Sequence, residues 1–157
     1  MNGDGTVTLW GKYGDYTSAS DAMGKNDTYA CGGFTTKDIF SFQYGYVEVR
    51  ARFDNVQGTW PSIWMMPTTM GTWPQNGEID IVEHLNNEQV AHQTIHSYQE
   101  SANKDQTHGP NPLPALTDPT GWHTYGLLWQ EGSITFFIDG QQTYTTTQYD
   151  LRYPFDT

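Results

Sequence analysis

The chain has 157 residues, a length typical of one domain with one hydrophobic core. Its 18 acidic residues outnumber 7 Lys and Arg, and the formal net charge of −11 argues against a nucleic-acid partner, which needs a basic surface. No apolar run reaches the roughly 18 residues of a membrane span, and the single cysteine, Cys31, excludes an internal disulfide and is expected to be a buried, unreactive thiol.

Strand patterns dominate the first half of the chain. The first ten residues, MNGDGTVTLW, lack the basic and apolar regions of a signal peptide. Residues 46–53 alternate polar and apolar side chains with a period of two, which predicts a strand. Residues 62–66 form a second predicted strand, flanked by loops rich in Trp, Gly and Pro between 54 and 76. No stretch of ten or more residues has helical periodicity, so we expect an all-β fold.

The next predicted strand, GEIDIVEH at 77–84, carries acids on both of its faces. Glu78 and Asp80 are two residues apart and share a face, but Glu83 has the opposite parity. A β-bulge near Ile81 and Val82 would send both aliphatic side chains to the core and return Glu83 to the face of the other two acids. Bulges are frequent beside active sites, because they redirect a side chain.

The second half of the chain predicts a loop followed by a meander. Residues 99–121 are polar and rich in proline, and we expect one long surface loop, either a wall of a binding cleft or a linker. Three apolar, aromatic or Thr-rich runs follow, separated by Glu131-Gly132 and Asp139-Gly140, the second of which is a strong hairpin signal. Residues 122–147 therefore predict a three-stranded antiparallel meander.

Three aligned carboxylates on one strand favour acid–base chemistry. Like charges a few ångströms apart raise one of the pKa values, so one Glu can stay ionised as a nucleophile while another holds a proton. This is the two-carboxylate arrangement of glycoside hydrolysis. A calcium site and a solvated acidic strand face are the alternatives that the pattern leaves open.

The sequence resembles glycoside hydrolase family 16, and in particular its laminarinase-like branch, which has two residues between the second and third acids. The resemblance implies a concanavalin-like β-jelly-roll sandwich with a concave substrate cleft, and hydrolysis with retention of configuration. It also implies that Glu78 is the nucleophile, Glu83 the acid/base and Asp80 the assisting acid. The matching stretches are YACGGFTTKDIFSFQYGYVEVRARF (29–53), GTWPSIWMMP (58–67), WPQNGEIDIVEH (73–84), QTIHSY (93–98) and WHTYGLLWQEGSITFFIDG (122–140).

The resemblance also suggests substrate-binding residues. Trp60 and Trp73 match aromatic positions at sugar subsites, and His96 matches a polar position facing the cleft. Tyr98 has the parity of His96 and joins it as a candidate. His96 alone could equally be a structural histidine.

Three further side chains have two interpretations each. Trp64 is expected in the core, because it lies on a strand among Ile and Met. Trp129 could face either sugar or core. Arg50 could form a surface ion pair with Glu48, or contact sugar or a carboxylate.

Complete sandwiches of this class have about 200–250 residues. We therefore expect 1–157 to be a single catalytic domain that is incomplete at both ends relative to the family, with a second chain or self-association as one way to complete it. No cofactor is expected. A structural calcium, which family members often carry, cannot be assigned to residues here.

The favoured function is an endo-β-1,3(4)-glucanase acting on laminarin, lichenan or barley β-glucan. A polysaccharide cannot enter a cell intact, so we expect a secreted, periplasmic or cell-surface protein. The alternatives are a non-catalytic sugar-binding module and a hydrolase of another polysaccharide, such as an agar-type galactan. A sulfated substrate would favour Lys and Arg in the cleft, and only 7 are present in the chain.

Overall fold

A computed structural model describes residues 1–13, 29–69, 71–99, 104–147 and 155. The chain divides into two compact units, Met1–Phe40 and Ser41–Thr157. That residues 1–157 form a single catalytic domain stays a prediction. The described residues contain no α-helix, as expected, and hence no helix that could cross a membrane.

The first unit contains a two-stranded antiparallel sheet, β1 (Gly11–Tyr13) paired with β2 (Tyr29–Cys31). Tyr13 and Tyr29 pack edge to face with ring centroids 5.4 Å apart. Cys31 is exposed, so the prediction of a buried thiol is wrong. The described residues of this unit form no second layer over the short ribbon of β1 and β2, which agrees with the exposure of Cys31.

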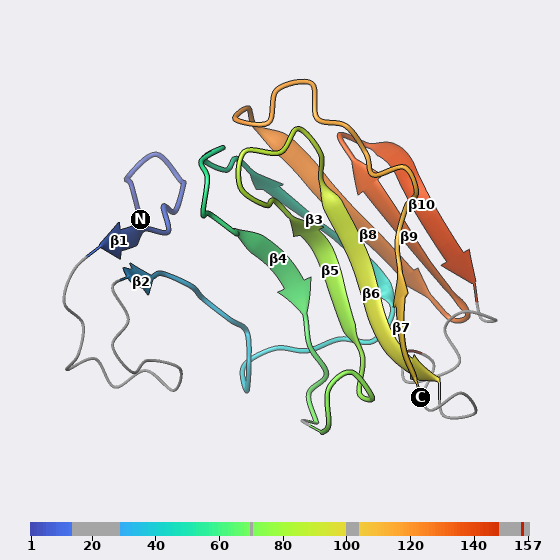
Figure 1. The fold of residues 1–157 in the computed structure, drawn as a ribbon. Helices are drawn as coiled ribbons and strands as arrows, with labels where there is room; N and C mark the ends of the chain where they lie inside the picture. The colour runs from blue at the N-terminus through green and yellow to red at the C-terminus, as the bar shows by residue number, and fades with distance from the viewer. Residues whose placement is uncertain (14–28, 70, 100–103, 148–154, 156–157) are drawn as a thin grey trace. The chain divides into compact units, whose positions relative to one another are not determined.

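The second unit is a sandwich of two four-stranded antiparallel sheets, which lie face to face in Figure 1. One sheet has the order β10-β9-β8-β3, and the other has the order β4-β5-β6-β7. The strands are β3 (Gly45–Ala51), β4 (Ser62–Met65), β5 (Glu78–Glu83), β6 (His92–Gln99), β7 (Lys104–His108), β8 (His123–Gln130), β9 (Ser133–Ile138) and β10 (Gln141–Thr147). The strands predicted at 46–53 and 62–66 and the meander at 122–147 are confirmed.

The core lies between the two sheets. Strands β5 and β6 contribute buried aliphatic side chains from one sheet, and β8 and β9 contribute aliphatic and aromatic ones from the other. Leu116 and Phe155 complete the buried cluster. The other buried members are Ala91, directly before β6, and the strand residues Ile79, Ile81, Val82, Ile95, Tyr125, Leu127, Ile134, Phe136 and Ile138.

The expectation of one unstructured loop over 99–121 is wrong for residues 104–108, whereas residues 109–121 form a loop apart from one isolated bridge. Residues 104–108 form β7, which pairs with β6 along its edge. Ala115 makes an isolated bridge with Val90, and Leu116 is 5% exposed. The polar sequence of β7 hides this strand, because an edge strand is held by backbone hydrogen bonds and needs no apolar face. Residues 100–103 of the expected loop lie outside the described residues.

His123 and Asp139 join the start of β8 to the turn between β9 and β10. His123 Nδ1 lies 2.6 Å from Asp139 Oδ2, and Nε2 lies 2.7 Å from the carbonyl oxygen of Asp118. Both partners only accept hydrogen bonds, so the imidazolium form satisfies both nitrogens. Burial alone would lower the pKa of His123, but these hydrogen bonds outweigh it and the pKa is raised. Burial would raise the pKa of Asp139, but the bonds from His123 and the Thr124 N–H outweigh it and the pKa is lowered.

We expect Asp139→Asn to destabilise the chain most between about pH 4 and pH 6.5, the ordinary pKa values of Asp and His. The raised pKa of His123 stabilises the fold fully below its unfolded pKa, and this contribution is lost as pH rises through the folded pKa. The lowered pKa of Asp139 stabilises the fold above its unfolded pKa, and this contribution is lost as pH falls through the folded pKa. Asn tolerates the positive φ of this position, 50°.

Because the Asp139 side chain is 51% exposed, we expect the loss to be only about 1 kcal/mol. Urea unfolding of both proteins at pH 5.5 and pH 9 measures it. A difference in the free energy of unfolding that is as large at pH 9 as at pH 5.5 contradicts the ionic interpretation.

Candidate active site

Strand β5 contains the bulge that the sequence predicts. Asp80 pairs with Thr94 and Glu83 pairs with His92, so β5 advances three residues while β6 advances two. The same irregularity appears against β4. Ile81 is 2% exposed and Val82 is fully buried, so two consecutive side chains enter the core. The bulge thereby returns Glu83 to the face that carries Glu78 and Asp80.

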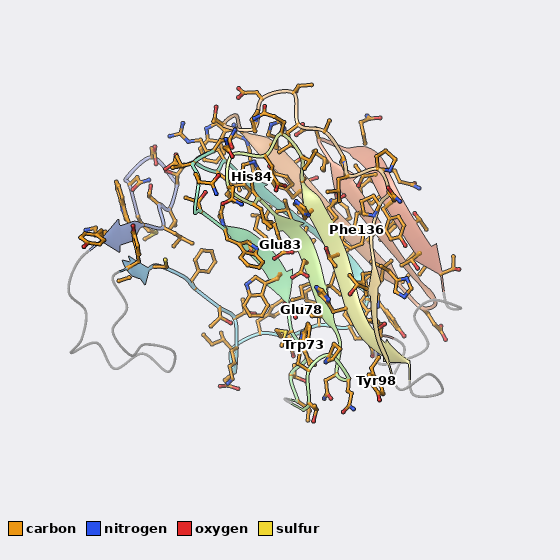
Figure 2. All side chains as sticks on the ribbon, in the orientation of Figure 1. Trp73, Glu78, Glu83, His84, Tyr98 and Phe136 are labelled. Atoms are coloured by element: carbon orange, nitrogen blue, oxygen red, sulfur yellow. The ribbon has the colours of Figure 1, made fainter. Side chains whose placement is uncertain are left out.

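The three acids line a groove on the outer face of the sheet β4-β5-β6-β7. The groove has a volume of about 370 Å³. Figure 2 shows Glu78 beside Trp73 and places Glu83 farther along β5. The lining residues are Trp60, Ser62, Trp64, Glu78, Asp80 and Glu83.

Each of the two outer acids accepts a hydrogen bond from a tryptophan. The Trp60 indole Nε1 donates to Glu83 Oε1 at 2.7 Å, and the Trp73 Nε1 donates to Glu78 Oε2 at 2.5 Å. Trp60 and Trp73 are also exposed, so their rings remain available for stacking. Each indole thus binds one oxygen of its carboxylate, and it makes no hydrogen bond to the other oxygen.

The middle acid is buried and paired with a histidine. Asp80 is 3% exposed, and its Oδ2 lies 3.2 Å from His96 Nε2. On the other side of the ring, His96 Nδ1 lies 3.4 Å from the hydroxyl of Thr107 on β7. The Trp73 ring lies against His96, with centroids 5.4 Å apart. His96 thus joins the acid strand to β7, and the expectation that it faces the cleft is supported by its contacts.

The surroundings of Glu78 and His96 shift the pKa values of both side chains. Burial raises the pKa of Glu78; the Trp73 N–H and His96 oppose this rise, and the Asp80 carboxylate adds to it. The hydrogen bond to Asp80 raises the pKa of His96, although burial opposes it. A positive His96 therefore offsets part of the negative charge of the row. A raised pKa does not by itself identify Glu78 as the ionised nucleophile. The expectation that Glu78 is the nucleophile depends on its place in the acid motif.

The position of Trp64 differs from the one that the sequence predicts. It is 54% exposed and lines the groove, so the expectation that it lies in the core is wrong. Its register partner is Asp80, which places both side chains on the outer face. Ser62 pairs with Glu83 in the same way. The parity of Trp60, Ser62 and Trp64 would have predicted this, since all three are even-numbered residues of one extended segment.

Two candidate sugar-binding residues lie in the other sheet. Trp129 on β8 packs against the core and contacts the Tyr44 ring at 5.5 Å, so a sugar-facing role is wrong. Arg50 on β3 lies over the Trp122 ring, 4.3 Å from its centroid. Its neighbour Ala51 packs toward the core, so Arg50 is on the outward face of β3, away from the acids.

Tyr98 lies on the face of β6 that carries His96, two residues beyond it. It is partly buried and is not among the residues that line the groove. Sequence reasoning missed Ser62, which lines the groove and pairs in register with Glu83. Within the described ranges, no three His, Cys, Asp or Glu side chains are grouped so that they could hold a metal ion.

Comparison with known proteins decides the family. The profile of glycosyl hydrolases family 16 matches residues 3–157, nearly the whole chain. The chain belongs to glycosyl hydrolases family 16. The resemblance to this family is thereby confirmed, and the functional roles of Glu78, Asp80 and Glu83 stay predictions.

Several family 16 relatives are similar over most of this chain. A β-glucanase of Rhodothermus marinus is 36% identical over 141 residues, covering 82% of this chain and 49% of the relative. A keratan-sulfate endo-1,4-β-galactosidase of Sphingobacterium multivorum is 38% identical over 136 residues, covering 82% of this chain and 32% of the relative. A solved non-specific endo-β-1,3(4)-glucanase superposes with a TM-score of 0.75 and 30% identity, covering 95% of this chain and 57% of the other. The chain thus spans between about a third and somewhat more than a half of the length of these proteins.

Proposed function

We propose that this chain carries the catalytic strand of an endo-acting, retaining glycoside hydrolase that cleaves β-1,3 or mixed-linkage β-1,3-1,4 glucan. The observation that carries the proposal is the bulge in β5, which turns Glu83 into the groove beside Glu78 and Asp80. A solvated acidic face has no need for a bulge, for buried Asp80, or for tryptophans bonded to both outer acids.

In this proposal the two glutamates have distinct roles. Glu83 protonates the glycosidic oxygen while Glu78 attacks the anomeric carbon, giving a glycosyl-enzyme. Glu83, now ionised, takes a proton from water, and the resulting hydroxide releases the sugar and regenerates Glu78. Asp80 and His96 orient the row, and the exposed rings of Trp60 and Trp73 stack on sugar.

The glucan substrate is supported by two of the family 16 proteins described above, which are named as glucanases. A polymer of this size cannot cross a membrane intact, so we infer a secreted, periplasmic or cell-surface location. Within the described residues, the edge strands of the two sheets pair with no further strand, and association with a second chain is a further proposal. The mass of the purified active species tests it.

A galactan is the second candidate substrate, because the galactosidase of Sphingobacterium multivorum is 38% identical to this chain. The residues that line the groove weigh against a sulfated galactan. The lining includes three acids, and it contains no Lys or Arg among the residues that the structure describes. The negative charge of an anionic polymer would be repelled by these acids, and no Lys or Arg of the described lining offsets that repulsion.

The proposal is tested by product analysis on laminarin, lichenan, barley β-glucan and keratan sulfate under the same conditions. We expect short oligosaccharides from one or more of the glucans, released from within the chain, with the β configuration at the new reducing end. Affinity electrophoresis in the same glucans distinguishes a binding module. Retarded migration without any new reducing ends at several pH values would reject hydrolysis in favour of binding.

A further inference from the structure

Gln93 is a polar side chain on the inner face of β6, one residue after the start of the strand. It is 1% exposed and lies between Ala91 and Ile95, both fully buried. The register places it at the bulge, because Thr94 pairs with Asp80 and His92 pairs with Glu83. Gln93 is therefore the single β6 residue that opposes the two bulged residues, Ile81 and Val82.

The Gln93 amide forms hydrogen bonds with backbone carbonyl oxygens and a hydroxyl near the irregular parts of the strands. Its Nε2 donates to the carbonyl oxygen of Ile81 at 3.3 Å and to that of Phe137 at 3.5 Å. Its Oε1 accepts from the Thr143 hydroxyl at 2.5 Å. Only this orientation of the amide works, because two carbonyl oxygens face Nε2 and need a donor. The side chain thus links β5 to both β9 and β10 of the opposite sheet.

A second bulge supplies the hydroxyl. Gln142 pairs with Phe137 and Tyr144 pairs with Phe136, so Thr143 is the extra residue on β10. Tyr144 packs against the core and the Thr143 hydroxyl reaches Gln93, so both of these neighbours point inward. Among the described residues each sheet therefore has a bulge, and the Gln93 amide joins the two across the core.

We propose that Gln93 is a positioning residue for Glu83, which acts by holding the Ile81 peptide in its bulged conformation. The proposal rests on the proposed role of Glu83 as acid/base. Without the bulge, a regular pleat would turn the Glu83 side chain to the opposite face. With a loosened bulge, Glu83 would move relative to the scissile bond, and misplacement of a catalytic group by about 1 Å lowers a rate about 100-fold.

The main test is Gln93→Met, which keeps the length and flexibility of the side chain and removes its hydrogen bonds. We expect kcat on the best glucan to fall about 10- to 100-fold, with KM changed by less than about twofold because the groove walls are untouched. The loss in kcat/KM, which reports formation of the glycosyl-enzyme, should be smaller for a 2,4-dinitrophenyl glycoside, whose leaving group needs no proton from Glu83. A general loss of structure would lower both activities by one factor, and this result would overturn the proposal.

Two further variants keep the test decisive. Thr143→Val removes only the hydroxyl that anchors Gln93, and we expect a smaller loss with the same dependence on the leaving group. Ser97→Ala alters another buried polar residue on the same face of β6, 3% exposed. It is the matched control, and we expect no dependence on the leaving group. If Gln93→Met does not fold, Thr143→Val alone decides: activity equal to the parent protein would overturn the proposal.

Amide hydrogen exchange separates this inference from the proposed function. We expect faster exchange at residues 81–83 in Gln93→Met than in the parent protein, and no such change in Ser97→Ala. Unchanged exchange at 81–83 overturns the positioning role whatever the activity. Absence of turnover by the parent protein on every glycan and aryl glycoside would reject the proposed function, while the exchange result would still report on the bulge.

Discussion

Glu78→Gln should abolish glucan hydrolysis, with a loss on the order of 10⁴-fold or more in kcat, while the fold is retained. The amide oxygen of Gln can still accept the Trp73 N–H, so the local hydrogen bond survives. What is lost is the carboxylate that forms the covalent bond to the anomeric carbon. Reducing-sugar release from the best glucan measures the effect.

The stability of this variant carries separate information. Burial and the Asp80 carboxylate both disfavour a charged Glu78, since they raise its pKa. Neutral Gln removes that disadvantage, so the thermal midpoint at neutral pH should be equal to or above that of the parent protein. Glu48→Gln is the matched control, because Glu48 is an exposed acid on β3 in the other sheet. Activity of Glu78→Gln close to that of Glu48→Gln would refute the nucleophile role.

The bulge in β5 could be predicted from sequence because two local rules conflict there. Glu78 and Asp80 fix one outer face, and a regular strand would then turn Val82 outward and Glu83 into the core. An extra residue resolves the conflict at low cost, whereas a buried carboxylate or an exposed run of aliphatic side chains does not. The structure places both Ile81 and Val82 in the core, as the argument requires.

Trp64 was missed although the same kind of evidence was available. Trp60, Ser62 and Trp64 alternate with Pro61, Ile63 and Met65, so a groove-facing Trp60 implies a groove-facing Trp64. Hydrophobic character alone favours the core for Trp64, but the parity of the strand places its side chain on the outer face. An exposed tryptophan beside carboxylates is typical of a sugar-binding surface and less typical of a core.

Other residues depend on strand order, which parity alone does not supply. Arg50 is correctly assigned to the polar face of β3, but β3 pairs with β8 in the sheet that lacks the acids. The Thr143 partner of Gln93 is 50 residues away along the chain. The edge strand β7 has no apolar pattern at all. Which strands pair over long distances in the chain, and which side chains meet across the two sheets, therefore cannot be predicted from parity and become visible only in the folded chain.

Glu83→Gln should lower kcat on glucan by about 10²- to 10⁴-fold, the usual contribution of a general acid and base. Gln keeps an acceptor for the Trp60 N–H, so the groove wall should stay in place. With a 2,4-dinitrophenyl glycoside, bond cleavage needs no proton and the first step is spared. The glycosyl-enzyme then accumulates, because no base activates water, and an initial burst of dinitrophenol should precede a slow steady state.

Azide distinguishes the role of Glu83 from that of Glu78. Azide needs no base to attack the anomeric carbon, so it should release the sugar from Glu78 in the Glu83→Gln variant and restore turnover of the aryl glycoside. The product should be the β-glycosyl azide, because two inversions at one carbon retain the configuration. The Glu78→Gln variant should give no burst and no azide rescue of this kind. An α-azide, or rescue in the Glu78 variant in place of the Glu83 variant, would mean that the two roles are assigned to the wrong glutamates.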